Sequence, residues 1–340
     1  MKILTSVVAT AILASVSFAD QIKIGGSSTV FPFSSYVAEE FGITKSKKTT
    51  IVESLGTGGG FKAFCSGVGA NTLDIANASR PMKKSEFEEC VKNSVTNISG
   101  YMIGYDGIVF AQNKDNKGAN FTKEQIFLAL AKEVPVNGVL VPNPYKKWSD
   151  IDKSLPNKQI IVYGPPTTSG TRDSFEEQLM QAASKSFKEY GDKAGKYGSI
   201  RDDETYIPSG ENDNLIITKL AQNKDAYGIF GYGFLAENGD KISALGIDGV
   251  LPSEMTVGNG SYKLSRSLFF YVKNAKRAQN PSINDFVNLF ISEPMIGKEG
   301  ILKTIGLIPM SDENLDKMQQ NVKMPTMLTK EMVESSKVTQ

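Results

Sequence analysis

The chain alternates short apolar runs rich in β-branched residues with longer amphipathic stretches. The apolar runs predict strands at 21–24, 49–53, 108–111, 160–163 and 268–272. The amphipathic stretches predict helices at 33–41, 61–67, 123–130, 173–187 and 284–292. This alternation is typical of an α/β fold.

Two segments lack a strong pattern, and neither repeats nor low-complexity segments are visible. Residues 188–203 are polar and are expected to follow the surface before the segment 204–207. The tail from residue 321 mixes Met and Lys, and we expect it to be loosely attached.

The first 19 residues have the features of a secretory signal peptide. Lys2 is followed by a small and apolar run over 3–18, which ends in Ser17-Phe18-Ala19. The alternative is a retained membrane anchor, but the run is marginal in length for a spanning helix. Cleavage leaves 321 residues (340 minus 19). This length favours two domains, and no later segment approaches 18 consecutive apolar residues.

The charge balance and the absence of histidine exclude several classes of function. There are 38 basic and 37 acidic residues, which argues against a nucleic-acid binder or a polybasic membrane-surface protein. Without histidine the chain has no Ser-His or Cys-His nucleophile pair, no HExxH zinc site and no imidazole general base. We therefore predict no metal site and no cofactor.

Cys65 and Cys90 are the two cysteines of the chain. In an exported protein such a pair favours a disulfide over a metal site, because two thiolates without histidine are a poor ligand set. The bridge closes a loop of about 25 residues, which stabilises the fold by roughly 3 kcal/mol. The alternative is two free thiols.

Three segments share one pattern, in which a strand is followed by small hydroxyl and glycine residues and then by a helix. They are residues 24–29, 54–60 and 167–171. The first turn of each helix offers unpaired N–H groups and the positive end of the helix dipole, and both favour an anion. The alternative for each segment is a simple N-cap. Residues 56–62 are not a P-loop, because no Ser or Thr follows Lys62.

Arg80 and Arg172 stand next to these segments. A guanidinium can bind two oxygens of a tetrahedral oxyanion at once, which a lysine does poorly. The alternative is a surface ion pair for each, for example Arg172 with Asp173.

The ordered set of motifs resembles one known family. The motifs are GSSTVFP at 26–32, GTGGGFK at 56–62, ASRP at 78–81, KWSD at 147–150, SGTRD at 169–173 and DAYGIFGY at 225–232. Together they resemble the periplasmic phosphate-binding proteins of phosphate ABC importers, which are type II periplasmic binding proteins. The resemblance covers nearly all of the mature chain.

The resemblance implies a two-lobed α/β fold that closes over one anion in the cleft between its lobes. Lobe one would contain residues 20–105 and 265–340, and lobe two residues 106–264. Neutral hydrogen bonds to phosphate would come from Ser28, Thr29, Thr57, Gly58, Ser169, Gly170 and Thr171. Arg80 and Arg172 would supply positive charge.

The charged residues depart from the best-known branch of that family. There, an aspartate at the position of Arg80 accepts the proton of bound phosphate, and an arginine precedes the Ser-Gly-Thr motif. This chain has Gly-Pro-Pro at 164–166 instead, so the acceptor must lie elsewhere. We expect Asp106, at the predicted crossing between lobes, with Asp173 and Asp74 as weaker candidates. The alternative for Asp106 is a turn residue before glycine.

The implied function is binding of inorganic phosphate in the periplasm and delivery to the membrane permease of an ABC transporter, by a monomer that is not an enzyme and binds no nucleic acid. Three alternatives remain open at this point. They are a receptor for sulfate, molybdate or tungstate, a secreted phosphatase, and a surface antigen that kept the fold. A phosphatase is disfavoured because the sequence has no dense metal-binding cluster and no evident base for Thr57 or Ser169.

Overall fold

The computed structural model describes residues 21–45, 50–210 and 213–336. The predicted signal peptide, residues 1–19, lies outside the described residues. The strands are β1 Lys23–Gly26, β2 Ile51–Ser54, β3 Ile75–Ala78, β4 Ile98–Asn113, β5 Asn120–Phe121, β6 Glu133–Val136, β7 Val139–Pro142, β8 Val162–Gly164, β9 Tyr206–Pro208, β10 Tyr227–Gly231, β11 Ile242–Ala244, β12 Gly246–Ile247 and β13 Ser265–Lys273.

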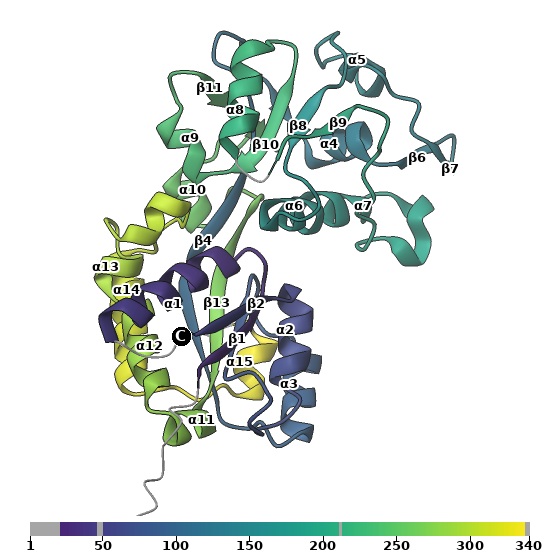
Figure 1. Ribbon diagram of the computed structural model, residues 1–340. Helices are drawn as coiled ribbons and strands as arrows, with labels where there is room; N and C mark the ends of the chain where they lie inside the picture. Colours follow the sequence, from purple (N-terminus) through teal and green to yellow (C-terminus); the bar gives the residue numbers. More distant parts are fainter. Residues whose placement is uncertain (1–20, 46–49, 211–212, 337–340) are drawn as a thin grey trace, which may run out of the picture.

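Helices follow most of these strands (Figure 1). The α-helices are α1 Phe31–Lys45, α2 Gly56–Phe64, α3 Lys84–Lys92, α4 Lys123–Leu130, α5 Trp148–Ile151, α6 Gly170–Phe175, α7 Ala182–Ser184, α8 Asp213–Gln222, α9 Gly233–Glu237, α10 Glu254–Gly258, α11 Asn274–Gln279, α12 Ser282–Phe290, α13 Glu293–Ile296, α14 Asp312–Lys323 and α15 Lys330–Glu334. A π-helix, η1 (Glu176–Gln181), joins α6 to α7, and 3-10 helices form η2 (Lys188–Lys193) and η3 (Ile301–Ile305).

Within the described residues, one sheet runs through the molecule in the order β2-β1-β3-β13-β4-β10-β8-β9, with β11 also pairing with β4. β1 is parallel to β2 and β3, and β8 is parallel to β9 and β10. The two central strands, β4 and β13, are antiparallel to each other and to their outer neighbours. The carboxyl ends of the parallel strands therefore point toward the middle of the molecule from both sides.

The apolar side chains collect into separate cores on the two sides of this middle region. The lower core in Figure 1 contains side chains from Ile22 to Ile103 and from Leu268 to Val333. The upper part contains a large core drawn from residues 108–264, together with Ile308, and a smaller core around α8. We call the lower part lobe one and the upper part lobe two. β4 and β13 run between them side by side (Figure 1).

Two of the predicted helices differ from the structure by more than shifted ends of a few residues, which also occur at α1 and α12. The helix expected at 61–67 begins earlier, at Gly56, because Gly56 adopts a φ of 69° that lets the chain turn directly out of β2. The helix expected at 173–187 is divided into α6, η1 and α7. Its middle section follows the wider π-helical spacing, which an apolar pattern does not distinguish from an α-helix.

The expectation of a loose tail is wrong for the described part of the C-terminal segment. Leu328 and Val333 are buried in the core of lobe one. The backbone N–H of Leu328 donates to the carbonyl of Ile98 over 2.8 Å, and Lys84 of α3 pairs with Glu334 of α15 at 2.9 Å. A few apolar residues at irregular spacing are enough to dock a short helix, and periodicity analysis misses them.

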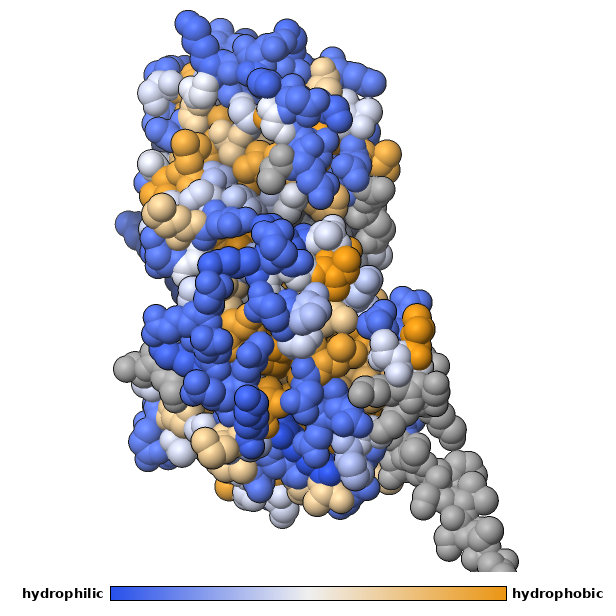
Figure 2. Space-filling view, turned by 90° about the vertical axis from the view of Figure 1, so that its left-hand side faces the viewer, coloured by the Kyte–Doolittle hydropathy of each residue, from blue (hydrophilic) through white to orange (hydrophobic). Residues whose placement is uncertain are grey.

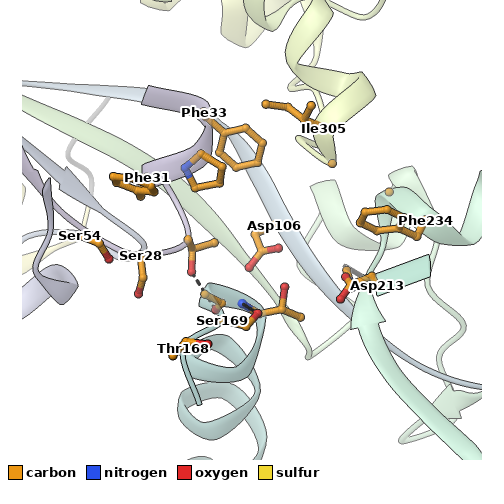
Figure 3. Close-up of a pocket in the computed structure, with 17 residues that line it drawn as sticks. Ser28, Phe31, Phe33, Ser54, Asp106, Thr168, Ser169, Asp213, Phe234 and Ile305 are labelled. Carbon is orange, nitrogen blue, oxygen red and sulfur yellow. Dashed lines mark hydrogen bonds between the residues drawn. The ribbon is translucent and has the colours of Figure 1, made fainter. Parts of the chain in front are cut away.

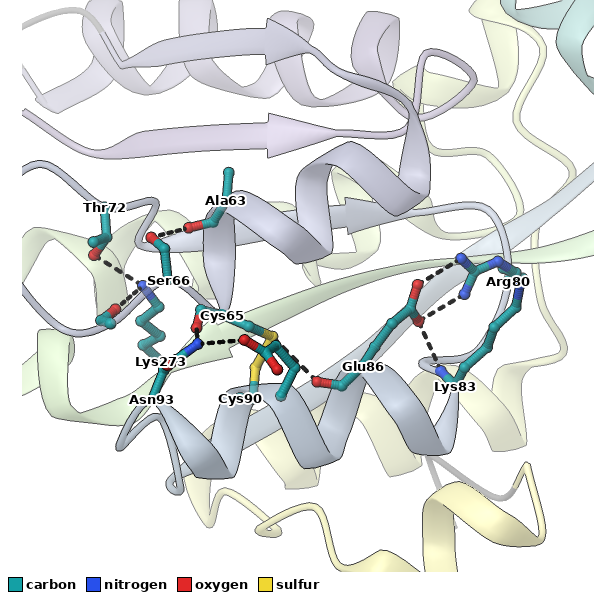
Figure 4. Close-up of a disulfide and its surroundings, with 12 residues drawn as sticks. Ala63, Cys65, Ser66, Thr72, Arg80, Lys83, Glu86, Cys90, Asn93 and Lys273 are labelled. Atoms are coloured by element: carbon teal, nitrogen blue, oxygen red, sulfur yellow. Dashed lines mark hydrogen bonds and ion pairs between the residues drawn. A yellow bond between two sulfur atoms is a disulfide. The ribbon is translucent and has the colours of Figure 1, made fainter.

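The disulfide prediction is confirmed, because Cys65 and Cys90 are bonded in the structure (Figure 4). The bridge connects the end of α2 to α3 inside lobe one. The molecular face seen in Figure 2 is mostly hydrophilic, with its hydrophobic side chains in several separate groups. None of the helices in the described ranges has the length and apolar character needed to span a membrane.

Candidate functional site

The residues of the hydroxyl and glycine segments gather between the two lobes, at the carboxyl ends of parallel strands. From lobe one come the loop after β1, with Ser28 and Thr29, and the start of α2, with Thr57. From lobe two come the loop after β8, which ends at Ser169, and the first residue of α6, Gly170. Such an edge is where open α/β sheets bind ligands, because helix N-termini and loop N–H groups converge there.

A cavity of about 410 Å³ lies in this region (Figure 3). Its lining residues from lobe one are Ser28, Thr29, Phe31, Pro32, Phe33, Ser54, Ile305 and Gly306. Those from the crossing strand and lobe two are Asp106, Thr168, Ser169, Gly170, Thr171, Asp213, Gly231, Gly233 and Phe234. The cavity combines hydroxyl groups and two carboxylates with aromatic side chains.

A second cavity of about 140 Å³ shares Ser28 and Thr29 with the first. Its further lining residues are Ser27, Gly56, Thr57, Ser79, Asp173, Glu176, Glu177, Gln181 and Arg266. It is smaller and more polar, and it holds a guanidinium. We call it the arginine cavity.

The lobes touch each other where the two cavities meet. The hydroxyl of Ser28 donates to the carboxylate of Asp173, and the hydroxyl of Thr29 donates to the carbonyl of Gly170 over 3.2 Å. A Cβ atom on Gly170 would lie 2.8 Å from the carbonyl oxygen of Ser28, which is closer than a side chain tolerates. Glycine at this position therefore permits the approach of the lobes.

The other predicted neutral donors are placed as follows. The hydroxyl of Thr57 lies 3.0 Å from that of Ser79 and also accepts the Ser79 backbone N–H over 3.1 Å. Ser169 caps α6, with its hydroxyl accepting the N–H of Thr171 over 3.2 Å. Gly58 lies inside α2 and is not among the residues that line either cavity.

The two predicted arginines lie outside the linings of these two cavities. Arg80 makes two hydrogen bonds to Glu86, of 2.9 and 2.7 Å (Figure 4). Burial lowers the pKa of Arg80, but the hydrogen bonds and charge of Glu86 outweigh it, so the pKa is raised.

Arg172 is buried and satisfied inside lobe two. Its Nε donates to Glu176 over 2.7 Å, and its guanidinium stacks over the ring of Tyr206 at 4.6 Å from the centroid. The partner is Glu176, one helical turn on, instead of the Asp173 considered from the sequence. Burial raises the pKa of the Glu176 carboxyl, and the charge of Arg172 opposes this shift.

Sequence reasoning missed Arg266, which is the arginine that lines the arginine cavity. It stands on β13 directly opposite Asp106 on β4. Its side chain is 10% exposed, and its Nε lies 3.5 Å from an Asp106 carboxylate oxygen. The sequence offered one signal for this residue. Arg266 follows the predicted lobe boundary at 264/265, and Asp106 follows the other predicted boundary at 105/106, so both were expected where the chain crosses between the lobes.

Asp106 lines the larger cavity and accepts the hydroxyl of Ser174 over 3.0 Å. The weaker candidates are placed differently. Asp173 is bonded to Ser28 at the contact between lobes. Asp74 precedes β3 and so lies at the opposite edge of the sheet, where burial raises its pKa and Lys276 lies 3.9 Å away.

A second residue that sequence reasoning missed is Asp213, which begins α8 and lines the larger cavity. One of its oxygens accepts the backbone N–H of Gly231 over 2.9 Å. Across the described ranges, no three acidic or cysteine side chains are grouped so that they could hold a metal ion.

Comparison with known proteins identifies the family. The model of the PBP superfamily domain matches residues 14–294. The chain belongs to the PBP superfamily. The predicted α/β, two-lobed fold class and the family resemblance drawn from the motifs are both confirmed.

Three named proteins are similar to the chain over most of their length. Protein SphX of Synechococcus elongatus is 32% identical over 85% of this chain and 77% of its own. The phosphate-binding protein PstS of Staphylococcus saprophyticus is 30% identical over 80% of this chain and 76% of its own. A crystal structure of a possible phosphate binding protein from Planctomyces limnophilus is 30% identical, with a TM-score of 0.73 over 89% of this chain and 98% of that one.

Proposed function

We propose that this chain binds inorganic phosphate between its lobes and delivers it to the membrane permease of an ABC importer. The observation that carries the proposal is the convergence of hydroxyl-bearing loops from both lobes on cavities that contain Arg266 and Asp106. The similarity to PstS supports phosphate as the ligand.

The proposed site uses neutral donors and two opposite charges. Ser28, Thr29, Thr57, Ser169, Gly170 and Thr171 supply hydroxyl and N–H donors, as the family resemblance implies. Arg266 supplies the positive charge instead of Arg80 and Arg172, since those two are paired with glutamates outside the cavities. Asp106 is the proposed acceptor of the phosphate proton.

Selectivity then follows from the protons of the ligand. Phosphate near neutral pH keeps at least one proton, and a carboxylate can accept it. Sulfate has no proton to donate, so Asp106 would face another acceptor of like charge. An unpaired buried acceptor costs about 1–3 kcal/mol, and repulsion adds to that cost. A receptor for sulfate, molybdate or tungstate would gain nothing from this carboxylate.

Further parts of the proposal concern organisation and location. The lobes, proposed as 20–105 with 265–340 and as 106–264, close over the anion by bending at β4 and β13. The chain acts as a monomeric, non-enzymatic receptor in the periplasm after its signal peptide is removed. The permease can then distinguish the loaded, closed form from the empty, open form.

Calorimetric titration of the refolded mature chain with phosphate and with sulfate at pH 7 tests this proposal. We expect tight one-to-one binding of phosphate and weak binding of sulfate. Equal binding of both anions would support the receptor for another oxyanion. Absence of binding to either would refute the proposal.

A further inference from the structure

Arg266 is held by groups from three parts of the molecule. Asp106 flanks it on the crossing strand, with its oxygen 3.5 Å from the guanidinium Nε. One terminal nitrogen donates to the hydroxyl of Thr29 over 2.6 Å and to that of Ser174. The other donates to Glu177 over 2.7 Å. Of the two carboxylates beside this guanidinium, Glu177 at 2.7 Å is therefore bound more closely than Asp106 at 3.5 Å.

Glu177 differs from the other partners of Arg266 because its carboxylate can turn away from the guanidinium into solvent. Its side chain is 49% exposed, whereas that of Arg266 is 10% exposed. It stands on η1, and its neighbour Glu176 turns instead to Arg172. Release of the Glu177 carboxylate into water needs no rearrangement of the core.

Glu177 and the proposed anion require the same donor. Glu177 lines the arginine cavity, and the terminal nitrogen that it engages is a strong charged donor there, which an anion bound by Arg266 would also use. Asp173 and Glu176 also line this cavity, so an entering anion meets three carboxylates unless one moves away. Exchange of Glu177 for the anion removes one of these repulsions.

We propose that Glu177 is an internal competitor that occupies Arg266 in the empty site and is displaced by the bound oxyanion. This inference rests on the proposed function, because it concerns affinity for the same ligand. Glu177 thereby weakens the binding of the anion. The empty protein keeps its guanidinium neutralised, and the affinity for phosphate is set below the value that Arg266 alone would give.

The Glu177→Gln variant tests the competition by phosphate calorimetry at pH 7. A partly exposed ion pair contributes up to about 1 kcal/mol, so we expect phosphate to bind about three- to fivefold more tightly. Glu177→Asp keeps the charge on a shorter side chain, so its phosphate affinity is expected to lie between those of the wild type and Glu177→Gln. Glu88→Gln is the matched control, since Glu88 is 52% exposed and pairs with Lys330 at 3.6 Å within lobe one. Its affinity should equal that of the wild type.

A double-mutant cycle shows whether the effect passes through Arg266. In an Arg266→Gln background, Glu177→Gln should no longer tighten binding, because there is no guanidinium to release. Weaker or unchanged binding in the single Glu177→Gln variant would overturn the inference while leaving the proposed function intact. A wild-type chain that binds no oxyanion would overturn both.

Discussion

Asp106→Asn is the substitution that most directly examines how phosphate is distinguished from sulfate. The aspartate side chain is 15% exposed and has two neighbours in the structure, the hydroxyl of Ser174 at 3.0 Å and the Nε of Arg266 at 3.5 Å. Asparagine has the same shape and keeps one oxygen for the Ser174 hydroxyl. The fold should therefore persist, while the negative charge is lost.

The magnitude follows from the hydrogen bond that the carboxylate accepts. A hydrogen bond to a charged group contributes about 1.5–3 kcal/mol, which corresponds to a loss of about 10- to 150-fold in phosphate affinity when the charge is removed. Sulfate changes in the opposite direction, because the amide of asparagine is a donor and the repulsion from the carboxylate is gone. The two anions should approach equal affinity.

Calorimetry with phosphate and sulfate, on wild type and variant at pH 7, measures both effects. A thermal melt without anion checks that the variant is folded. Retention of phosphate-over-sulfate selectivity in Asp106→Asn would refute the assignment of the acceptor. If selectivity is lost instead in Asp213→Asn, the second carboxylate of the larger cavity is the acceptor.

Three further substitutions test closure, covalent stabilisation and a buried charge. Gly170→Ala places a Cβ 2.8 Å from the carbonyl oxygen of Ser28, so calorimetry should show phosphate binding weakened about tenfold or more while the empty protein melts normally. Joint replacement of Cys65 and Cys90 by serine opens a loop with a sequence separation of 25, and denaturant titration should show a loss of about 3 kcal/mol in the free energy of unfolding. Burial lowers the pKa of Lys273 to about 8 from 10.5, so the unfolded chain binds the proton more tightly. The free energy of unfolding of the wild type should consequently rise by up to about 3 kcal/mol between pH 8 and pH 10.5 relative to Lys273→Met, measured by denaturant titration.

Each of these expectations has a control or a contrary outcome. Gly42→Ala, in α1, adds a Cβ that meets no atom within 4 Å and should leave phosphate affinity unchanged. Wild-type affinity in Gly170→Ala would show that the lobes do not need this close approach. An unchanged denaturation midpoint in the serine variant would contradict the loop-closure estimate. Parallel pH profiles for the wild type and Lys273→Met would mean that the buried ammonium keeps its ordinary pKa.

Local order along the chain was sufficient to predict the fold class and several of the loops that line the two cavities. The segments around Ser28, Thr57 and Ser169 each follow a strand and open a helix, and that pattern places them at one edge of a sheet. The disulfide was predictable because the two cysteines of the chain leave one intramolecular pairing. The ion pair of Arg172 with Glu176 has the i,i+4 spacing of a helical pair, although Glu176 begins η1 and Arg172 lies in α6.

The choice among the arginines was decided by the tertiary structure. Arg266 and Asp106 are 160 residues apart and meet because β4 and β13 pair in one antiparallel register. A shift of one residue in that register would turn either side chain to the other face of the sheet. Pairing of distant strands depends on the packing of both lobes, and the position of Arg266 beside the predicted lobe boundary does not give the register of that pairing. The sequence by itself therefore determined which loops surround the cleft, while the three-dimensional pairing of strands determined which charges lie inside it.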